Sequence, residues 1–208
     1  MFVYNKTFYY FLKKALDFAY PVFCINCNSK IQTLFYFGFC KTCFRRLIFI
    51  KENSCRKCGR FFAPGKSEKN ICAQCRENAY YFEKCFSVLI FNEYIRKPLF
   101  AFKYSGKKHY GYFFASLMAA SLKKFLLKET SSNYIIAPVP LFRKRKQQRG
   151  FNQSKILALH ITKKLNLSYD DFLIKTMDTS SQTELSKKQR RKRNSTTIRQ
   201  HLNAASSY

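Results

Sequence analysis

Apolar residues are spaced as in short strands and helices from about residue 80 onward. Between residues 109 and 127, Phe113, Leu117, Leu122 and Leu126 form an apolar stripe, which is typical of a helix that packs on one face. The predicted elements are, in order, a strand over 86–91, helices over 94–104 and 109–127, a strand from 134 that ends at two prolines, a helix over 152–165 and a strand over 172–176. This order predicts an α/β layer built on a mostly parallel sheet.

Residues 1–22 are rich in Phe and Tyr and predict an N-terminal amphipathic helix. Lys6, Lys13, Lys14 and Asp17 interrupt it, so no uncharged stretch reaches the roughly 18 residues that a membrane helix needs. No small-residue cleavage site of a signal peptide follows. We expect a cytoplasmic protein without a transmembrane segment, whose first helix packs its aromatic face on the protein; peripheral membrane binding is the alternative.

Residues 134–153 combine a β-branched run, a cluster of cations and the start of a helix. Pro138 and Pro140 end the run, and five cations without an acid follow, namely Arg143, Lys144, Arg145, Lys146 and Arg149. Gly150 offers a permissive backbone position before the helical pattern begins. Side-chain cations, backbone amides and a helix N-terminus in this order predict a basic loop that binds anions. A solvated basic loop is the alternative.

The charge of the whole chain points the same way. Thirty-nine Lys and Arg against 11 Asp and Glu give a formal net charge of +28. Such a charge favours a polyanionic partner, for example nucleic acid, a phosphosugar or an anionic membrane. Lysine-rich codon usage alone is the competing explanation. The apolar content of 47%, with 23 Phe and 14 Tyr, supports a packed core and argues against disorder.

Eight of the nine cysteines form four Cys-x-x-Cys pairs. The pairs are Cys24/Cys27, Cys40/Cys43, Cys55/Cys58 and Cys72/Cys75. Two such knuckles complete a tetrahedral four-thiolate site, so the spacing predicts one or two structural Zn²⁺ ions rather than disulfides. Redox cysteines or an iron–sulfur cluster are the alternatives, and the spacing leaves open which pairs share an ion. Asn28 and Gly59, directly after a knuckle, suit a left-handed turn.

Other residues of this region have more than one interpretation. Cys85 has no partner pair and is expected to be a small apolar residue in a strand. Aromatic side chains lie among the paired cysteines, namely Phe35, Tyr36, Phe37, Phe39 and Phe44. They are expected to form the small core of the ribbons, or else to stack nucleobases.

A second basic segment follows the last predicted strand. Ser186 suits a helix N-cap, and six of the next seven residues, 187–193, are Lys or Arg. Such a helix is exposed, and we expect it to cover an anionic ligand as a lid. Ligands of open α/β sheets bind at the carboxyl ends of the strands, where this loop and lid would meet.

With these motifs the chain resembles the ComF family of competence proteins, built from zinc ribbons followed by a phosphoribosyltransferase-like domain. The resemblance covers the four cysteine pairs and three further groups of residues. These are 102–106 (Phe-Lys-Tyr-Ser-Gly), Pro138-Val139-Pro140-Leu141 with Arg145 and Arg149-Gly150-Phe151-Asn152-Gln153, and Gln182-Thr183, Leu185-Ser186, Arg190-Arg191 and Asn194. It implies an N-terminal helix over 1–22, a double zinc ribbon over 23–79 and a type I phosphoribosyltransferase-like α/β domain over 80–208.

The resemblance also implies a function. It implies uptake of single-stranded DNA in natural transformation beside a competence helicase, and affinity for 5-phosphoribosyl diphosphate (PRPP) with Mg²⁺. The diphosphate would lie against Arg143, Arg145, Arg149, Gly150, Asn152 and Gln153, with Gln182, Arg190 and Arg191 in the lid. A non-enzymatic protein that binds single-stranded DNA or docks a helicase is the alternative.

One departure from the family bears on activity. Family members continue with an apolar strand, two adjacent aspartates and a Thr-Thr-Gly loop, which hold the ribose and its 5-phosphate. Here residues 195–208 contain no such motif, and Asp170 and Asp171 precede a predicted strand instead of ending one. We therefore expect an incomplete domain with little catalysis, from a frameshift, gene decay or a fragment.

Overall fold

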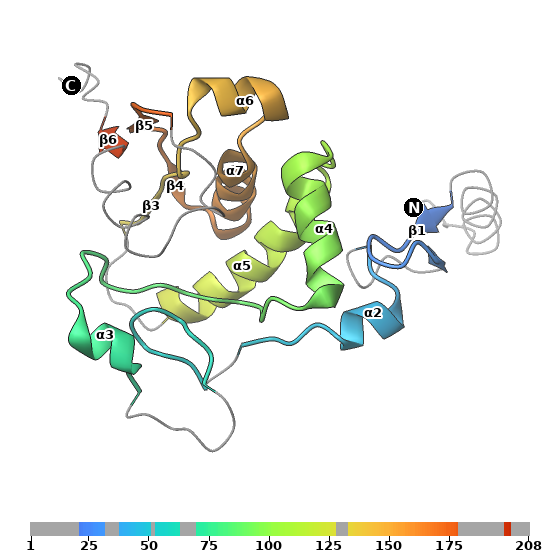
Figure 1. Ribbon diagram of the computed structural model, residues 1–208, viewed down its shortest axis with the longest axis horizontal. Helices are drawn as coiled ribbons and strands as arrows, with labels where there is room; N and C mark the ends of the chain where they lie inside the picture. Colours follow the sequence, from blue (N-terminus) through green and yellow to red (C-terminus); the bar gives the residue numbers. More distant parts are fainter. Residues whose placement is uncertain are drawn as a thin grey trace, which may run out of the picture. The chain divides into compact units, whose positions relative to one another are not determined.

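A computed structural model of the chain describes residues 21–31, 38–50, 53–62, 70–127, 133–178 and 198–200. The chain divides into two compact units, residues 1–99 and 100–208, which are described separately below (Figure 1). The predicted helix over 1–22 and the predicted lid with Gln182, Arg190 and Arg191 lie outside the described residues. No described helix is long and apolar enough to cross a membrane.

The first unit consists of short elements around the paired cysteines. The elements that it contains are β1 (Val22–Phe23), which pairs antiparallel with β2 (Lys30–Ile31), α2 (Lys41–Arg45) and α3 (Ala73–Glu77). Cys24 and Cys27 follow β1, whereas Cys40 and Cys72 are the N-caps of α2 and α3. Elements this short bury little apolar surface, so they need another source of stability.

The predicted strand over 86–91 is extended but forms only an isolated bridge. Phe49 pairs antiparallel with Leu89, and the backbone N–H groups of Ile50 and Ile90 donate to the carbonyl oxygens of Val88 and Ile48, both at 2.9 Å. This pairing holds residues 48–50 and 88–90 together. Cys85, predicted as an apolar strand residue, is instead exposed.

Helix α4 (Glu93–Tyr104) confirms the helix predicted over 94–104. The Asn92 side chain fixes its start, since Oδ1 accepts the N–H of Ile95 at 3.2 Å and Nδ2 donates to the carbonyl oxygen of Arg46 at 3.0 Å. Pro98 lies within the helix and is fully buried.

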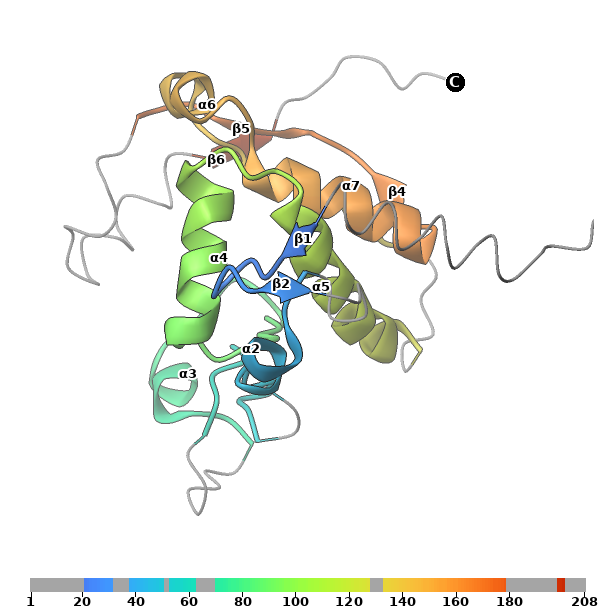
Figure 2. The same ribbon diagram turned by 90° about the vertical axis from the view of Figure 1, so that its right-hand side faces the viewer.

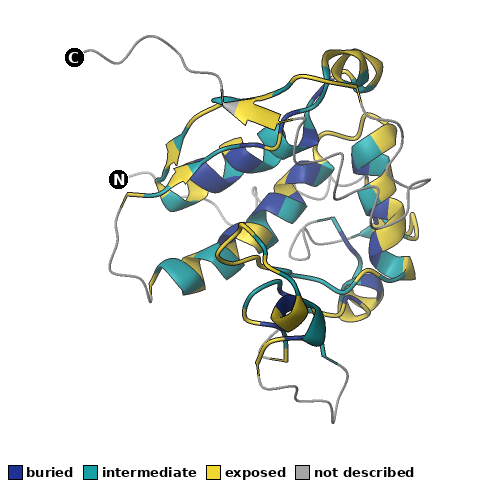
Figure 3. Cartoon of the chain, turned by 60° about the vertical axis from the view of Figure 1, so that its left-hand side comes forward, coloured by how far each residue is buried: buried dark blue, intermediate teal, exposed yellow. Residues whose placement is uncertain are grey.

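Two long helices form the core of the second unit. Helices α5 (Tyr110–Leu126) and α7 (Gln153–Leu165) confirm two predicted helices, and they pack side by side (Figures 1 and 2). Ala115, Ala119 and Ile161 are buried between them, as the dark blue segments of both helices indicate (Figure 3). Gly111 makes the close approach possible, because a Cβ there would lie 2.7 Å from Cγ2 of Ile156.

The described strands form three two-stranded sheets, of which one is parallel. β3 (Ile135–Ile136) pairs parallel with β4 (Ser168–Tyr169), and β5 (Leu173–Lys175) pairs antiparallel with β6 (Ile198–Gln200). The predicted mostly parallel sheet is therefore not found among these strands, and the phosphoribosyltransferase-like fold stays an expectation. The chain has a mixed helix and strand architecture with a two-site cysteine ribbon in its N-terminal part.

Because β4 exists, the two adjacent aspartates lie between two strands, which the sequence pattern does not predict. Asp170 and Asp171 precede the strand predicted over 172–176, but they also directly follow β4. Asp171 accepts a hydrogen bond from Nζ of Lys155, in the first turn of α7, at 2.8 Å. The sequence gives no sign of β4, because two residues, one of them a serine, produce no apolar run.

The predicted basic loop is in fact a helix. Residues Arg143–Arg149 form α6, none of whose side chains is buried. Arg, Lys and Gln have high intrinsic helix propensity, so a helix can form here without an apolar stripe. Gly150 ends it in the left-handed conformation with φ of 73°, and its N–H donates to the carbonyl oxygen of Gln147 at 3.3 Å.

Candidate metal centres and anion-binding segment

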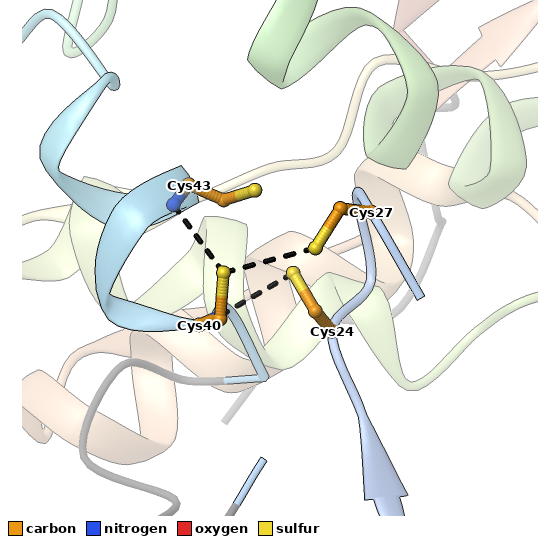
Figure 4. A group of neighbouring side chains, drawn as sticks. All are labelled: Cys24, Cys27, Cys40 and Cys43. Atoms are coloured by element: carbon orange, nitrogen blue, oxygen red, sulfur yellow. Dashed lines mark hydrogen bonds between the residues drawn. The ribbon is translucent and has the colours of Figure 1, made fainter. Parts of the chain in front are cut away.

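The first candidate metal centre contains Cys24, Cys27, Cys40 and Cys43. Their four sulfur atoms lie within 4.8 Å of one another (Figure 4). The Sγ atoms of Cys27 and Cys40 are 3.7 Å apart. Tetrahedral zinc with bonds of about 2.3 Å places its sulfur ligands roughly 3.8 Å apart, so the arrangement fits the ion.

Backbone geometry positions these four thiols. Asn28 adopts φ of 62° after the first knuckle, and its N–H donates to the carbonyl oxygen of Cys24 at 2.9 Å. The N–H of Cys40 donates to Sγ of Cys24 at 3.3 Å, and the N–H of Cys43 donates to Sγ of Cys40 at 3.4 Å (Figure 4). Amide groups that point at sulfur stabilise the thiolate form that binds a metal.

The second candidate metal centre contains Cys55, Cys58, Cys72 and Cys75 and repeats this arrangement. Its sulfur atoms also lie within 4.8 Å of one another, with 3.7 Å between Cys58 and Cys72. The N–H of Cys72 donates to Sγ of Cys55 at 3.4 Å. Neighbouring pairs therefore share a site in both centres, which resolves the pairing that the spacing left open.

Gly59 fixes the turn after Cys58, as Asn28 fixes the turn after Cys27. It adopts φ of 69°, and a Cβ there would lie 2.8 Å from both the carbonyl oxygen of Cys85 and the nitrogen of Ser87. The left-handed turns expected after both knuckles are thus present. The fit of the Cys85–Ser87 segment against the turn gives a second reason for glycine at this position.

The thiols within each centre differ in acidity. Hydrogen bonds from the side chain and backbone of Ser29 lower the pKa of Cys27 to about 6, whereas burial raises the pKa of Cys43 to about 12. In the second centre burial opposes ionisation of Cys55, but backbone N–H groups of neighbouring residues lower its pKa to about 6. Burial raises the pKa of Cys75 to about 12.

These differences predict how zinc affinity depends on pH. A ligand that is protonated in the metal-free protein must lose its proton to bind, so affinity falls as pH falls. Cys43 and Cys75 are protonated in the metal-free protein across the neutral range, so each releases a proton when zinc binds. Cys27 and Cys55 are protonated, and release a proton on binding, only below their pKa of about 6. The logarithm of affinity should therefore fall more steeply per pH unit below about pH 6 than above it. Competition with a chromogenic chelator across this range measures the slope, and one unchanged slope would contradict the assignment.

Both centres fit structural zinc. Four thiolates fill the tetrahedral positions of the ion and leave none for water or substrate. The thiols of Cys24, Cys43, Cys55, Cys72 and Cys75 are also buried. A closed site of this kind supplies folding energy and holds the surrounding chain in place.

The predicted anion-binding residues lie on and directly after α6. Arg143 is exposed, and Nε of Arg145 lies 3.6 Å from Oδ1 of Asp178. Nη1 of Arg149 donates to Oε1 of Gln153 at 3.3 Å, and its guanidinium group lies 4.8 Å from the centre of the Tyr104 ring. Part of the cationic cluster is therefore engaged within the protein.

Asn152 and Gln153 have structural contacts. Oδ1 of Asn152 accepts the N–H of Ser154 at 2.9 Å and caps α7, while Nδ2 donates to the carbonyl oxygen of Val139 at 3.1 Å. Gln153 is buried, and Nε2 donates to the carbonyl oxygen of Lys103 at 2.8 Å. These bonds hold the start of α7 against two other segments, and a role of either residue in binding an anion stays a prediction.

Lys175, at the end of β5, lies near this cationic cluster, and the sequence pattern does not predict it as a site residue. Burial lowers the pKa of Lys175, and the nearby positive charge of Arg145 lowers it further. Asp178 acts on Lys175 in the opposite direction and also pairs with Arg145. Lys175 lies in an apolar strand far from Arg145 in sequence, so only the three-dimensional structure shows that the two cations interact.

Comparisons with known proteins find a family model and a curated relative that the chain resembles. The model of a double zinc ribbon domain matches residues 15–76. Competence protein ComFC of Bacillus subtilis (strain 168) is 26% identical over 125 residues, which are 57% of this chain and 49% of that protein. The chain thus spans about half the length of the curated relative that it matches. No solved structure matches the chain.

Proposed function

We propose that this chain, a ComF-family protein, handles single-stranded DNA during natural transformation, and that its first unit contacts the strand. The two zinc-binding ribbons are the feature on which this proposal mainly rests. Ribbons of this kind often bind nucleic acid, and the name of the relative places that protein in competence. A competence helicase is the protein partner that we expect beside the DNA.

The charge distribution around the ribbons supports the proposal. Exposed cations lie between or next to the metal ligands in both centres, namely Lys41, Arg45, Arg56, Arg60 and Arg76. The metals hold these cations on a rigid framework, so they can contact successive phosphates with little loss of chain entropy. The net charge of +28 adds a long-range attraction to the same ligand.

A titration of the zinc-loaded chain with a labelled single strand of about 20 nucleotides tests the proposal. Affinity should fall steeply as salt rises, with a slope of the log–log plot of about −0.7 per phosphate contacted. A duplex of the same sequence serves as the control, and we expect the single strand to bind more tightly. Absence of single-strand binding at low salt would disprove the proposal.

A phosphorylated small molecule at α6 is the second candidate ligand. Arg145 and Lys175 repel one another electrostatically near Asp178, and an anion between them would relieve this repulsion. PRPP with Mg²⁺ is the ligand that the family resemblance favours, with its diphosphate against Arg143, Arg145 and Arg149. If the phosphoribosyltransferase-like domain transfers a phosphoribosyl group, these cations would stabilise the leaving diphosphate.

The same titration with PRPP and Mg²⁺ tests this second candidate. Arg145→Ala combined with Arg149→Ala should abolish binding if α6 holds the diphosphate. Lys163→Ala combined with Lys164→Ala removes an equal charge from the exposed end of α7 and serves as the matched control. Equal effects of the two double variants would show that only net charge matters.

A further inference from the structure

A shallow groove lies beside the second metal centre. It has a volume of about 480 Å³ and opens broadly to solvent. Two cations, Arg56 and Lys57, and three consecutive aromatic residues, 80–82, line it together with Ile71 and Glu83. We call this cavity the knuckle groove, because Arg56 and Lys57 lie between the metal ligands Cys55 and Cys58.

Aromatic side chains that line the knuckle groove are exposed to solvent. The rings of Tyr80 and Phe82 have their centres 5.1 Å apart, and Phe82 is 40% exposed. Tyr81 is fully exposed. Covering a solvent-exposed aromatic ring with another flat group lowers the free energy. These rings are therefore suited to a ligand with planar faces.

The first cysteine pairs of the two centres differ in charge. Ile25 and Asn26, which are uncharged, lie between Cys24 and Cys27, whereas Arg56 and Lys57 lie between Cys55 and Cys58. Basic side chains beside exposed rings match a ligand that alternates anionic groups with planar ones. Single-stranded nucleic acid has this alternation of phosphates and bases.

We infer that the knuckle groove binds unpaired nucleobases of a single strand, with Tyr81 and Phe82 stacking on bases while Arg56 and Lys57 contact the flanking phosphates. This inference rests on the proposed function and assigns it a site. A duplex does not present the faces of its bases, because they are stacked on one another inside the helix. The groove therefore selects single strands over double strands.

The second metal centre holds the knuckle groove in shape. Tyr80 packs against the cluster of Cys55, Cys72 and Cys75. The N–H of Arg56 donates to the carbonyl oxygen of Asn70, and the N–H of Cys85 donates to that of Lys57, both at 2.8 Å. Two sides of the groove are thus attached to the metal-binding knuckle, and DNA binding at this site depends on the zinc ion.

A tryptophan reporter tests the inference directly. The chain contains no Trp, so Tyr81→Trp introduces a single indole whose fluorescence a stacked base quenches. The zinc-loaded full chain is titrated with an unlabelled single strand and with the matching duplex. We expect strong quenching by the single strand and little by the duplex. Phe91→Trp, at a residue of the same unit that is 61% exposed and outside the groove, is the matched control and should respond little.

Two sets of variants then separate stacking from charge. Tyr81→Ala with Phe82→Ala should weaken single-strand binding roughly tenfold or more, whereas Tyr81→Phe, which keeps the ring, should bind as the wild type does. Arg56→Ala with Lys57→Ala should reduce the salt slope by about 1.4. Lys163→Ala with Lys164→Ala removes the same charge from the exposed end of α7, away from both centres, and should leave the slope unchanged. Native mass spectrometry confirms that each variant retains its zinc.

The outcomes distinguish the inference from the proposed function. If the wild type binds single strands but Tyr81→Ala with Phe82→Ala binds equally well, the groove is not the site and the proposed function stands. Equal quenching of Tyr81→Trp by duplex and single strand would also overturn the inference. If the wild type binds no single strand at all, both proposals are wrong.

Discussion

Replacing Cys55 with serine is expected to unfold the second ribbon and to reduce bound zinc from two ions to one. The buried cluster around this centre consists of Cys55, Cys72 and Cys75, with Phe62 and Tyr80 packed against it. So small a core cannot offset the entropy of ordering the chain, whereas a structural zinc site contributes on the order of 10 kcal/mol. A serine hydroxyl is a poor zinc ligand at neutral pH, so most of this contribution should be lost.

Native mass spectrometry counts the ions, and limited proteolysis of residues 53–85 reports whether the ribbon is folded. Cys85→Ser is the matched control, because the exposed thiol of Cys85 belongs to neither centre. This variant should keep both ions and its resistance to protease. A Cys55→Ser protein that retains two zinc ions and an intact ribbon would contradict the four-thiolate assignment.

Truncation of Phe102 to alanine should destabilise the second unit by about 3–5 kcal/mol. Phe102 is 1% exposed, and the centre of its ring lies 5.6 Å from that of Phe114 and 6.0 Å from that of Phe151. It also contacts α5 at Gly111, where the chain has no side chain of its own to fill space. Removing the ring leaves a cavity beside α4, α5 and Phe151, and a closely packed interior relaxes into such a cavity only in part.

The comparison with Phe100→Ala isolates the effect of burial. Phe100 lies on α4 two residues earlier and is 47% exposed, so its loss should cost only about 1 kcal/mol. Hydrogen exchange of the α5 and α7 amides measures the free energy of unfolding of the second unit in both variants. Equal losses at the two positions would show that the ring of Phe102 is not part of the core.

The metal centres could be predicted almost completely from the sequence. Two residues between thiols fit one turn around an ion, and this requirement is local, so the spacing alone identified all eight cysteines that the structure brings together in two four-sulfur clusters. The left-handed turns at Asn28 and Gly59 followed from residue type in the same way. Only the sharing of sites between pairs needed the structure, because several combinations satisfy the same spacing.

The elements of the second unit were predictable where they repeat an apolar pattern. Helices α5 and α7 have such a pattern, whereas α6 has none and was expected to be a loop. β4 has two residues, and its partner β3 lies before both α6 and α7 in the chain. Pairing between strands so distant depends on the packing of the helices between them, which sequence periodicity does not report.

The contacts of the anion-binding segment were the least predictable. Asn152 and Gln153 were expected to face a ligand, yet their amide groups donate to the carbonyl oxygens of Val139 and Lys103. No motif in the sequence points to Lys175, although it interacts electrostatically with Arg145. Both results depend on segments that are remote in sequence, and a motif identifies residue types without their partners.

The compactness of each metal centre along the chain affects how the protein is made. All four ligands of the first centre lie between Cys24 and Cys43, and those of the second between Cys55 and Cys75. Loops this short close rapidly and at small entropic cost. Each ribbon can therefore acquire its ion as soon as it leaves the ribosome, the first before the second has emerged. The two ribbons then fold around their ions one after the other, while the helices that follow in the sequence are still being translated.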